Sequence, residues 1–319
     1  MSEITLRTVT RTQGNNQALK DGTVVPRGLR FEFEEVPVLI DAFRRMVRGM
    51  EFDVCEMALT TYVCARAHGK RFTALPIFLV RAFHHGAILH NVNAGIRSPK
   101  DLEGQRVGVN RGYTVTTGLW ARSVLQHEYG VDLSKITWVL SGDEHVAEYR
   151  PPANVVPIEA GRKMGEMLAS GQLAAAIGVE SAMGQGAADV ATLIPDAKEA
   201  GYAALKRDGH YPINHLIVVK DEVLEARPQA AAQLFEAFAE AKRRYVERLQ
   251  RGAIEAPTAV DEVHRRVMQI TGADPLPYGI AANRAMLEQA VASALEQGII
   301  GRPVAVEHLF APSTRGLAG

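Results

Sequence analysis

Hydrophobic and polar positions alternate in two different ways along the N-terminal part of the chain. Residues 5–10 and 29–36 carry apolar side chains at about every second position, which predicts β-strands. Residues 37–50 begin with proline and repeat their apolar residues at helical spacing. Residues 52–57 predict another strand, and residues 60–68 another helix. This order predicts an α/β fold whose sheet is mostly parallel and flanked by helices.

A second set of elements in the same order follows between about residues 95 and 212. It begins at residues 98–109, where a serine and a proline open a short helical turn before the next strand. Its other elements are the helices 113–129 and 161–170 and the strands 136–140 and 174–179. A second sheet is therefore expected.

The chain then returns to the first set through a strand at residues 211–219. Long amphipathic helices follow at 228–250, 259–271 and 283–297. We therefore predict a discontinuous lobe one (1–94 and 213–319) and an inserted lobe two (95–212). The length of 319 residues agrees with two cores. A ligand is expected in the cleft between the lobes, at the carboxyl ends of the parallel strands.

Composition narrows the class of partner. The chain has 36 basic and 36 acidic side chains, so its formal net charge is zero. This balance gives no electrostatic footprint for nucleic acid or for an anionic membrane surface. Apolar residues make up 47% of the chain, yet no run approaches the roughly 18 apolar residues that a membrane span needs. We expect no nucleic-acid partner and no membrane partner.

The first residues, MSEITLR, lack the basic and apolar regions of a secretory signal. The two cysteines, Cys55 and Cys64, lie nine positions apart in an apolar region, where reduced thiols are expected. Both features favour a cytoplasmic location.

Several segments resemble one known family. They are FDVCEM at 52–57, RAFHH at 81–85, SPKDLEGQRVGV at 98–109 and YPINH at 211–215, together with Arg11-Thr12 and LKDG at 19–22. Taken in chain order, over most of the first 245 residues, they are similar to segments of the 4,5-dihydroxyphthalate decarboxylase family. The segment 98–109 recurs in many type II solute-binding proteins, whereas Arg81, His85 and His215 in these contexts are more specific.

The resemblance implies a two-lobed periplasmic-binding-protein type II fold and a cytoplasmic enzyme. Such an enzyme removes carbon dioxide, without oxidation, from a hydroxylated aromatic dicarboxylate, and 4,5-dihydroxyphthalate would give protocatechuate. The chain departs from the family pattern at His84, where the family usually has an arginine. Segments 110–117 and 141–145 also differ, so the exact substrate stays open.

Loss of a carboxylate from a phenolic ring requires a proton donor for the ring carbon, a base for a ring hydroxyl and cations for the remaining carboxylate. Histidine suits the proton transfers because it titrates near neutral pH. The resemblance favours His85 and also points to His215, and His84 is a candidate for binding substrate. The alternative for His84 and His85 is an exposed or hydrogen-bonded histidine on a hinge strand, and the alternative for His215 is a core histidine paired to the backbone.

Arginine suits the carboxylate, because its guanidinium can bind it with two parallel hydrogen bonds. Arg81 is the first candidate, with an interlobe salt bridge as its alternative. Arg11 is the second, with a solvated loop arginine as its alternative. Glu180, at the end of the strand 174–179, could accept a phenol proton.

The segment that opens the helix at 113–129 could hold an anion, because free N–H groups and the positive helix end lie there. Plain helix capping explains it equally well. The substrate-binding candidates in and beside this segment are Arg111, Tyr113, Thr114, Thr116, Thr117 and, in the divergent loop, His145. Glu144 in the same loop is a weaker candidate. A divalent metal stays open, because four histidines and a glutamate could converge in space, although no HxH, HExxH or CxxC spacing is present.

Three functions fit this fold. The first is the aromatic-acid decarboxylase, and the second is a non-catalytic solute-binding protein for a small carboxylate. The third is a sensing or thiamine-precursor protein. Several histidines in the expected cleft and the missing signal favour the enzyme, with a small aromatic carboxylate as its substrate. The amphipathic C-terminal helices could supply a dimer surface, so a homo-oligomer stays open.

Overall fold

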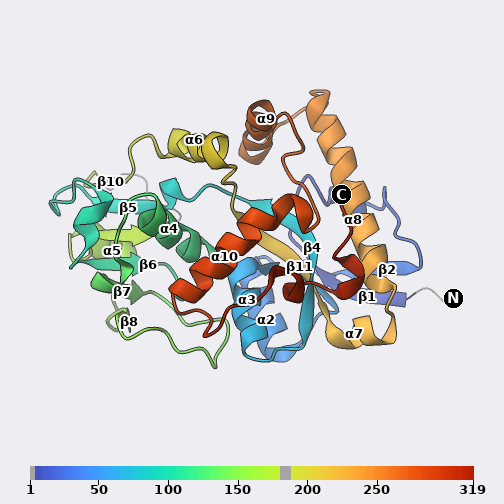
Figure 1. The fold of residues 1–319 in the computed structure, drawn as a ribbon, viewed down its shortest axis with the longest axis horizontal. Helices are drawn as coiled ribbons and strands as arrows, with labels where there is room; N and C mark the ends of the chain where they lie inside the picture. The colour runs from blue at the N-terminus through green and yellow to red at the C-terminus, as the bar shows by residue number, and fades with distance from the viewer. Residues whose placement is uncertain (1–3, 180–187) are drawn as a thin grey trace. The chain divides into compact units, whose positions relative to one another are not determined.

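The computed structural model describes residues 4–179 and 188–319. The chain divides into two compact units, which we call unit 1 and unit 2 (Figure 1). Unit 1 comprises Met1–Arg81, Ile213–Gln289 and Val304–Gly319, and unit 2 comprises Ala82–Pro212 and Ala290–Pro303. The chain is therefore discontinuous in both units.

Unit 1 is built on a five-stranded mixed sheet with the strand order β2-β1-β3-β11-β4. Its strands are β1 (Ile4–Val9), β2 (Leu29–Phe33), β3 (Val54–Ala58), β4 (Phe72–Arg81) and β11 (Ile213–Lys220). The first three run parallel to one another, and β11 runs antiparallel to β3 and β4. Its helices are α1 (Gln17–Lys20), α2 (Leu39–Gly49), α3 (Leu59–Ala67), α7 (Asp221–Ala226), α8 (Ala230–Gln250) and α9 (Ala259–Thr271).

Helices α2, α3, α8 and α9 of unit 1 form where the apolar spacing predicts them. Helix α2 buries Ala42, Phe43, Met46 and Val47 on one face, and it ends at Met50 in the left-handed conformation. Every residue of β3 is buried, which agrees with a central strand covered on both faces. The core of unit 1 therefore surrounds the strand that carries Glu56.

Unit 2 contains a six-stranded mixed sheet with the order β10-β5-β9-β6-β7-β8. Its strands are β5 (Ile88–Asn91), β6 (Arg106–Val109), β7 (Thr137–Leu140), β8 (Val155–Pro157), β9 (Ala175–Ile177) and β10 (Val190–Thr192). Strands β6 to β9 pair in parallel, whereas β5 runs antiparallel to β9 and β10. Its helices are α4 (Thr116–His127), α5 (Met164–Ala169) and α6 (Ala197–Asp208), preceded by the short 3-10 helix η1 (His85–Ala87).

Two segments that the expected boundaries placed in lobe one group with unit 2. Residues 82–94 do so because β5 hydrogen-bonds to β9 and β10. Residues 290–303 do so because α10 (Arg284–Glu296) passes into unit 2, where Ser293 hydrogen-bonds to Ser123. The amide of Gln297 also donates to the carbonyl of Leu119 at 3.1 Å. The hydrogen-bonding partners of these two segments place both of them in unit 2. The spacing of apolar residues does not reveal such partners.

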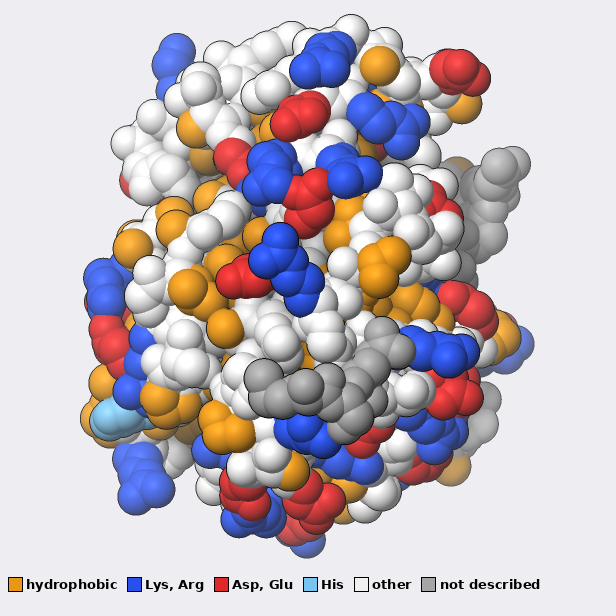
Figure 2. Space-filling model, turned by 90° about the vertical axis from the view of Figure 1, so that its right-hand side faces the viewer, with side chains coloured by type: hydrophobic (Ala, Val, Ile, Leu, Met, Phe, Trp, Pro, Cys, Tyr) orange, Lys and Arg blue, Asp and Glu red, His pale blue; other side chains and the backbone are white. Residues whose placement is uncertain are grey.

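The surface carries charges of both signs. Figure 2 shows basic and acidic side chains interspersed over the face that it displays. Charged side chains of opposite sign also form ion pairs, and Arg244 pairs with Glu240 at 2.6 Å. Among the helices that the structure describes, none is long and apolar enough to cross a membrane.

Candidate functional site

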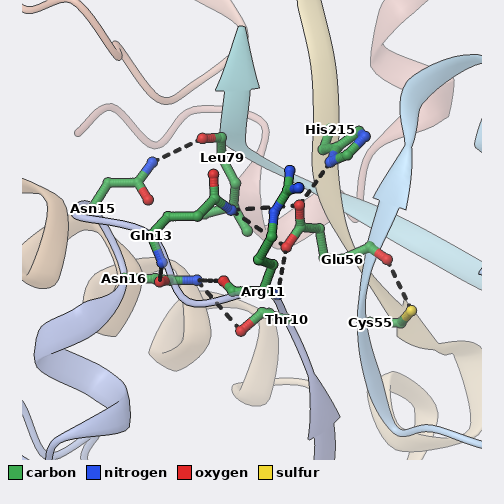
Figure 3. A network of polar contacts seen from close by, with 9 residues as sticks. All are labelled: Thr10, Arg11, Gln13, Asn15, Asn16, Cys55, Glu56, Leu79 and His215. Carbon is green, nitrogen blue, oxygen red and sulfur yellow. Dashed lines mark hydrogen bonds and ion pairs between the residues drawn. The ribbon is translucent and has the colours of Figure 1, made fainter. Parts of the chain in front are cut away.

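A buried carboxylate and a histidine form a pair in the sheet of unit 1. Glu56 lies on β3 with its side chain fully buried, and His215 lies diagonally from it on β11. The Nδ1 atom of His215 is 2.7 Å from Oε1 of Glu56 (Figure 3). An ionised carboxylate only accepts hydrogen bonds, so Nδ1 donates and the neutral ring keeps its lone pair on Nε2. The pair can therefore present a base whose tautomer is set by Glu56.

The loop after β1 completes the environment of Glu56. The backbone N–H of Arg11 donates to Oε2 of Glu56 at 2.9 Å, and the side-chain amide of Gln13 lies 3.4 Å from both carboxylate oxygens (Figure 3). The rings of Phe43 and His215 stand nearly perpendicular to each other, with centroids 5.3 Å apart. Glu56 thus satisfies its oxygens with donors from β11 and from this loop.

A pocket of about 510 Å³ lies within unit 1 beside the same loop. Arg11 and Arg81, the two arginines expected to bind a carboxylate, both line it. Arg81 is the last residue of β4 and is buried, and its Nη2 donates to Oδ1 of Asn283. Arg11 is exposed. The structure therefore places two guanidinium groups at one pocket, while their role in binding substrate stays a prediction.

The same pocket is lined by three residues that form a hydrogen-bonded chain. The hydroxyl of Tyr245, on α8, lies 2.6 Å from Oδ1 of Asp261 and 2.8 Å from Nδ1 of His264, both on α9. Burial raises the pKa of Asp261, but hydrogen bonds from Tyr245 and Thr258 outweigh it, so this pKa lies below its usual range. Burial lowers the pKa of His264 to about 4. At neutral pH this hydrogen-bonded group therefore consists of the Asp261 carboxylate, the Tyr245 phenol and the neutral His264 imidazole.

In unit 2, His85 lies in η1 with its side chain fully buried. Its Nε2 is 3.0 Å from Oε1 of Glu128, at the end of α4, while its Nδ1 has no hydrogen-bond partner among the described residues. The ring of His210 stands edge-on to His85, with centroids 6.4 Å apart. Burial raises the pKa of Glu128, but the hydrogen bond and charge of His85 outweigh it, so this pKa lies below its usual range.

The expected anion cradle at the start of α4 already holds a carboxylate of the chain. Glu144 accepts hydrogen bonds from the backbone N–H of Tyr113 and, at 3.1 Å, from that of Thr114. The Thr114 hydroxyl adds a third hydrogen bond at 2.6 Å. These N–H groups do bind an anion in this structure, but the anion is the side chain of Glu144.

Beneath this segment lies Arg122, a fully buried cation of α4. Its Nη2 donates to the carbonyl of Tyr113 at 2.7 Å, its Nε donates to Gln297 at 2.8 Å, and its guanidinium lies 3.8 Å from the centroid of the Tyr113 ring. Burial lowers the pKa of Arg122, and the charge of Glu144 counteracts this effect. The positive charge of Arg122 helps to explain why a carboxylate settles at this helix start.

Comparison with known proteins places the chain in a family. No family model matches it. It is 30% identical over 286 residues to a protein of Comamonas testosteroni named 4,5-dihydroxyphthalate decarboxylase, and the match covers 86% of each chain. The chain belongs to the 4,5-dihydroxyphthalate decarboxylase family. A Pseudomonas putida protein of the same name is 35% identical over 170 residues, which is 50% of this chain and 66% of that one.

Solved structures confirm the fold expected for this member of the decarboxylase family. The periplasmic aliphatic sulphonate binding protein SsuA from Escherichia coli superimposes with a TM-score of 0.56 at 12% identity, covering 99% of this chain and 100% of that one. The desulfurization enzyme DSZB gives 0.55 at 16% identity, covering 98% and 97%. A binding protein and an enzyme share this fold, so the fold alone does not separate the two functions.

The predicted residues of this decarboxylase-family chain lie in both units. Unit 1 carries Arg11, Arg81 and His215, and unit 2 carries His84, His85, Arg111, Tyr113, Thr114, Thr116, Thr117 and His145. His84 and His145 are buried, and Thr116 and Thr117 begin α4. Arg111 is exposed with a positive φ of 72°, and its N–H donates to Ser141 at 2.7 Å. Glu180 lies outside the described residues.

Sequence reasoning did not find five polar residues that form these hydrogen-bonded groups, namely Glu56, Glu128, Tyr245, Asp261 and His264. Glu56 offered the clearest signal, because a carboxylate inside a strand of otherwise apolar residues needs a partner. No sequence motif marks Tyr245, Asp261 and His264 as a hydrogen-bonded group. No group of three or more His, Cys, Asp or Glu side chains is arranged to hold a metal within residues 4–179 and 188–319.

Proposed function

We propose that the protein is a carboxy-lyase that acts on a hydroxylated aromatic dicarboxylate such as 4,5-dihydroxyphthalate. The products would be protocatechuate and carbon dioxide. Two relatives that carry this name support the substrate class. The structural observation that carries the proposal is the hydrogen-bonded pair of His215 and the fully buried Glu56. The loop that also donates to Glu56 carries Arg11, which lines a pocket together with Arg81.

The reaction exchanges a carboxylate for a proton at one ring carbon. In our proposal, His215 accepts the proton of the hydroxyl para to the leaving carboxylate, and the freed electrons raise the electron density at that carbon. A proton then adds to the carbon, the bond to the carboxylate breaks, and its electron pair restores the aromatic ring as carbon dioxide leaves. The phenolate that results takes its proton back from His215. The expectation that His85 supplies the added proton rests on the family resemblance.

The two arginines would act on the carboxylate that remains. Arg81 is held by Asn283 at the end of a strand, so its guanidinium loses little freedom on binding. Arg11 is exposed and can reach a second oxygen or a second carboxylate. Holding the retained carboxylate fixes the ring without stabilising the carboxylate that must leave.

The direct test is to incubate the purified protein with a panel of hydroxylated phthalates and benzoates. Release of carbon dioxide and a change in ring absorbance are expected with 4,5-dihydroxyphthalate. Tight binding of these compounds without turnover of any of them would contradict the proposal and indicate a solute-binding protein. Activity lost on chelation and restored by a divalent ion would show a metal requirement.

Action in the cytoplasm is part of the same proposal. Cys55 and Cys64 are both buried and form no disulfide, and burial raises the pKa of the Cys55 thiol well above its usual range. Cysteines outside disulfides are typical of a reducing compartment. Cell fractionation with an antibody against the protein would test this location.

A further inference from the structure

The pocket of unit 1 contains a neutral histidine that neither the family resemblance nor the predicted chemistry uses. We propose that His264 recognises a hydroxyl group of the ligand, accepting a hydrogen bond at Nε2, while Arg11 and Arg81 bind the carboxylate of the same ligand. This inference deepens the proposed function and rests on it. It makes His264 a residue that selects hydroxylated aromatic acids over unhydroxylated ones.

The hydrogen bonds around Tyr245 fix the tautomer of His264. Oδ2 of Asp261 accepts the N–H and the hydroxyl of Thr258, at 2.7 and 2.8 Å, and Oδ1 faces the hydroxyl of Tyr245. Because the ionised Asp261 can only accept, Tyr245 gives it its single proton. The oxygen of Tyr245 is then an acceptor for His264, which must carry its proton on Nδ1. The lone pair of the neutral ring is left on Nε2.

The charge state of His264 decides which ligand group it can meet. Burial lowers its pKa to about 4, helped by Arg81 and opposed by Asp261 and Asp274. The ring is therefore neutral at physiological pH and offers a lone pair rather than a positive charge. Such an acceptor attracts a hydroxyl and repels a carboxylate. No hydrogen bond to Nε2 occurs among the described residues.

A second acceptor lines the same pocket. The amide nitrogen of Asn15 donates to the carbonyl of Leu79 at 2.9 Å, which fixes the orientation of the amide because a carbonyl only accepts. Oδ1 of Asn15 is buried and has no donor in the described structure. A buried acceptor without a donor costs free energy, so it favours a ligand that brings one. Arginines and neutral acceptors together match a molecule with both a carboxylate and hydroxyls.

The loop that carries Arg11 lies directly against this hydrogen-bonded chain. A Cβ atom added to Gly14 would lie 2.4 Å from Cε2 of Tyr245, which is closer than side chains approach. Only glycine therefore lets the loop approach the Tyr245 ring this closely. This contact keeps Arg11 and His264 at the walls of one pocket.

Binding of two stable ligands tests the inference without any turnover. Titration calorimetry on the full chain compares 3,4-dihydroxybenzoate with benzoate, which share a carboxylate and differ in their hydroxyls. The wild-type protein should bind the dihydroxy compound about tenfold more tightly, the value of one hydrogen bond. His264→Asn can still donate to Tyr245 but lacks an acceptor at the position of Nε2, so this preference should vanish. His264→Gln offers an amide oxygen there and should keep most of it.

The control is His308→Asn, because His308 is exposed and does not line the pocket. An unchanged preference in His264→Asn would overturn the inference. If thermal melting shows that His264→Asn does not fold, Tyr245→Phe decides the question. Tyr245→Phe keeps the aromatic ring at position 245 but no longer fixes the tautomer of His264. The preference for 3,4-dihydroxybenzoate over benzoate should therefore fall at least about threefold, and an unchanged preference again overturns the inference. Absence of carbon dioxide from 4,5-dihydroxyphthalate would contradict the proposed function separately, since the binding ratio needs no turnover.

Discussion

Glu144 accepts two hydrogen bonds from Thr114, one from its backbone N–H at 3.1 Å and one from its hydroxyl at 2.6 Å. The carboxylate thereby fastens the loop around residues 141–150 to the residues that precede α4. A substrate carboxylate could use these donors only by displacing Glu144. The contact therefore matters both for the stability of unit 2 and for any binding at this helix start.

Glu144→Gln should destabilise the protein. The amide keeps one acceptor oxygen, but its NH₂ group faces N–H donors and the negative charge near Arg122 is lost. We expect the free energy of unfolding to fall by about 1.5–3 kcal/mol, the range for hydrogen bonds to a charged group. Urea denaturation measures it, with the exposed neighbour Asp143→Asn as the control. Equal stability of the two variants would show that Glu144 contributes little.

His85→Ala should abolish turnover while the protein still binds substrate. The proposed proton donor to the ring carbon is lost, so kcat should fall by about 100-fold or more, with the dissociation constant changed by less than about threefold. Stopped-flow absorbance and titration calorimetry measure the two quantities. His127→Ala, at an exposed histidine of the same unit, serves as the control. Activity that survives in His85→Ala would remove His85 from the mechanism.

Glu56→Gln should lower kcat and leave KM nearly unchanged, because Glu56 acts through His215. The neutral amide no longer sets the tautomer of His215 or stabilises its protonated form, and a loss of about 100-fold is within the usual contribution of acid–base catalysis. The pH profile of kcat should shift as well, which a purely structural role would not cause. Glu32→Gln, at an exposed position on β2, is the matched control.

The pKa of His264 predicts how stability depends on pH. In the folded protein it lies at about 4, below the ordinary 6.5, so the unfolded chain binds more protons between these two values. Stability is therefore complete above about pH 6.5 and falls as the pH is lowered towards 4, by up to about 3 kcal/mol. The low pKa of Asp261 acts below this window, because a carboxylate with a lowered pKa loses its contribution only as it protonates.

Chemical denaturation at pH 7 and at pH 5 measures this dependence. His264→Asn should remove most of the difference between the two pH values, because no imidazole remains to be protonated. The exposed His308→Asn should retain it. An equally steep fall in His264→Asn would assign the pH dependence to other groups.

The sequence predicted best the elements whose ends carry local signals. Helix α9 has the predicted bounds 259–271, because Thr258 and Asp261 form a capping box at its start and Gly272 ends it in the left-handed conformation. Helix α6 has only a weak apolar stripe, and the sequence does not predict it. The polar stretch with Gly14, Asn15, Asn16 and Gly22 predicts a loop, yet the short helix α1 forms within it.

The candidate site divides in the same way. Arg11, Arg81 and His215 could be named because they lie in segments that resemble a family. The link from Asp261 through Tyr245 to His264 could not, because it depends on how α8 packs against α9, and 16 residues separate Tyr245 from Asp261. Glu144 was considered only as a weak candidate, since nothing local shows which donors a loop carboxylate will meet.

The close approach of Gly14 to Tyr245 limits how the pocket can change. Any side chain at position 14 would push the loop off the aromatic ring, so mutation there should cost folding before it alters ligand choice. Arg11 is exposed and Gln13 half-buried, so both can be exchanged with less disturbance. Evolution or design that redirects this pocket to another aromatic acid should therefore work at positions 11 and 13 and keep the glycine between them and α1.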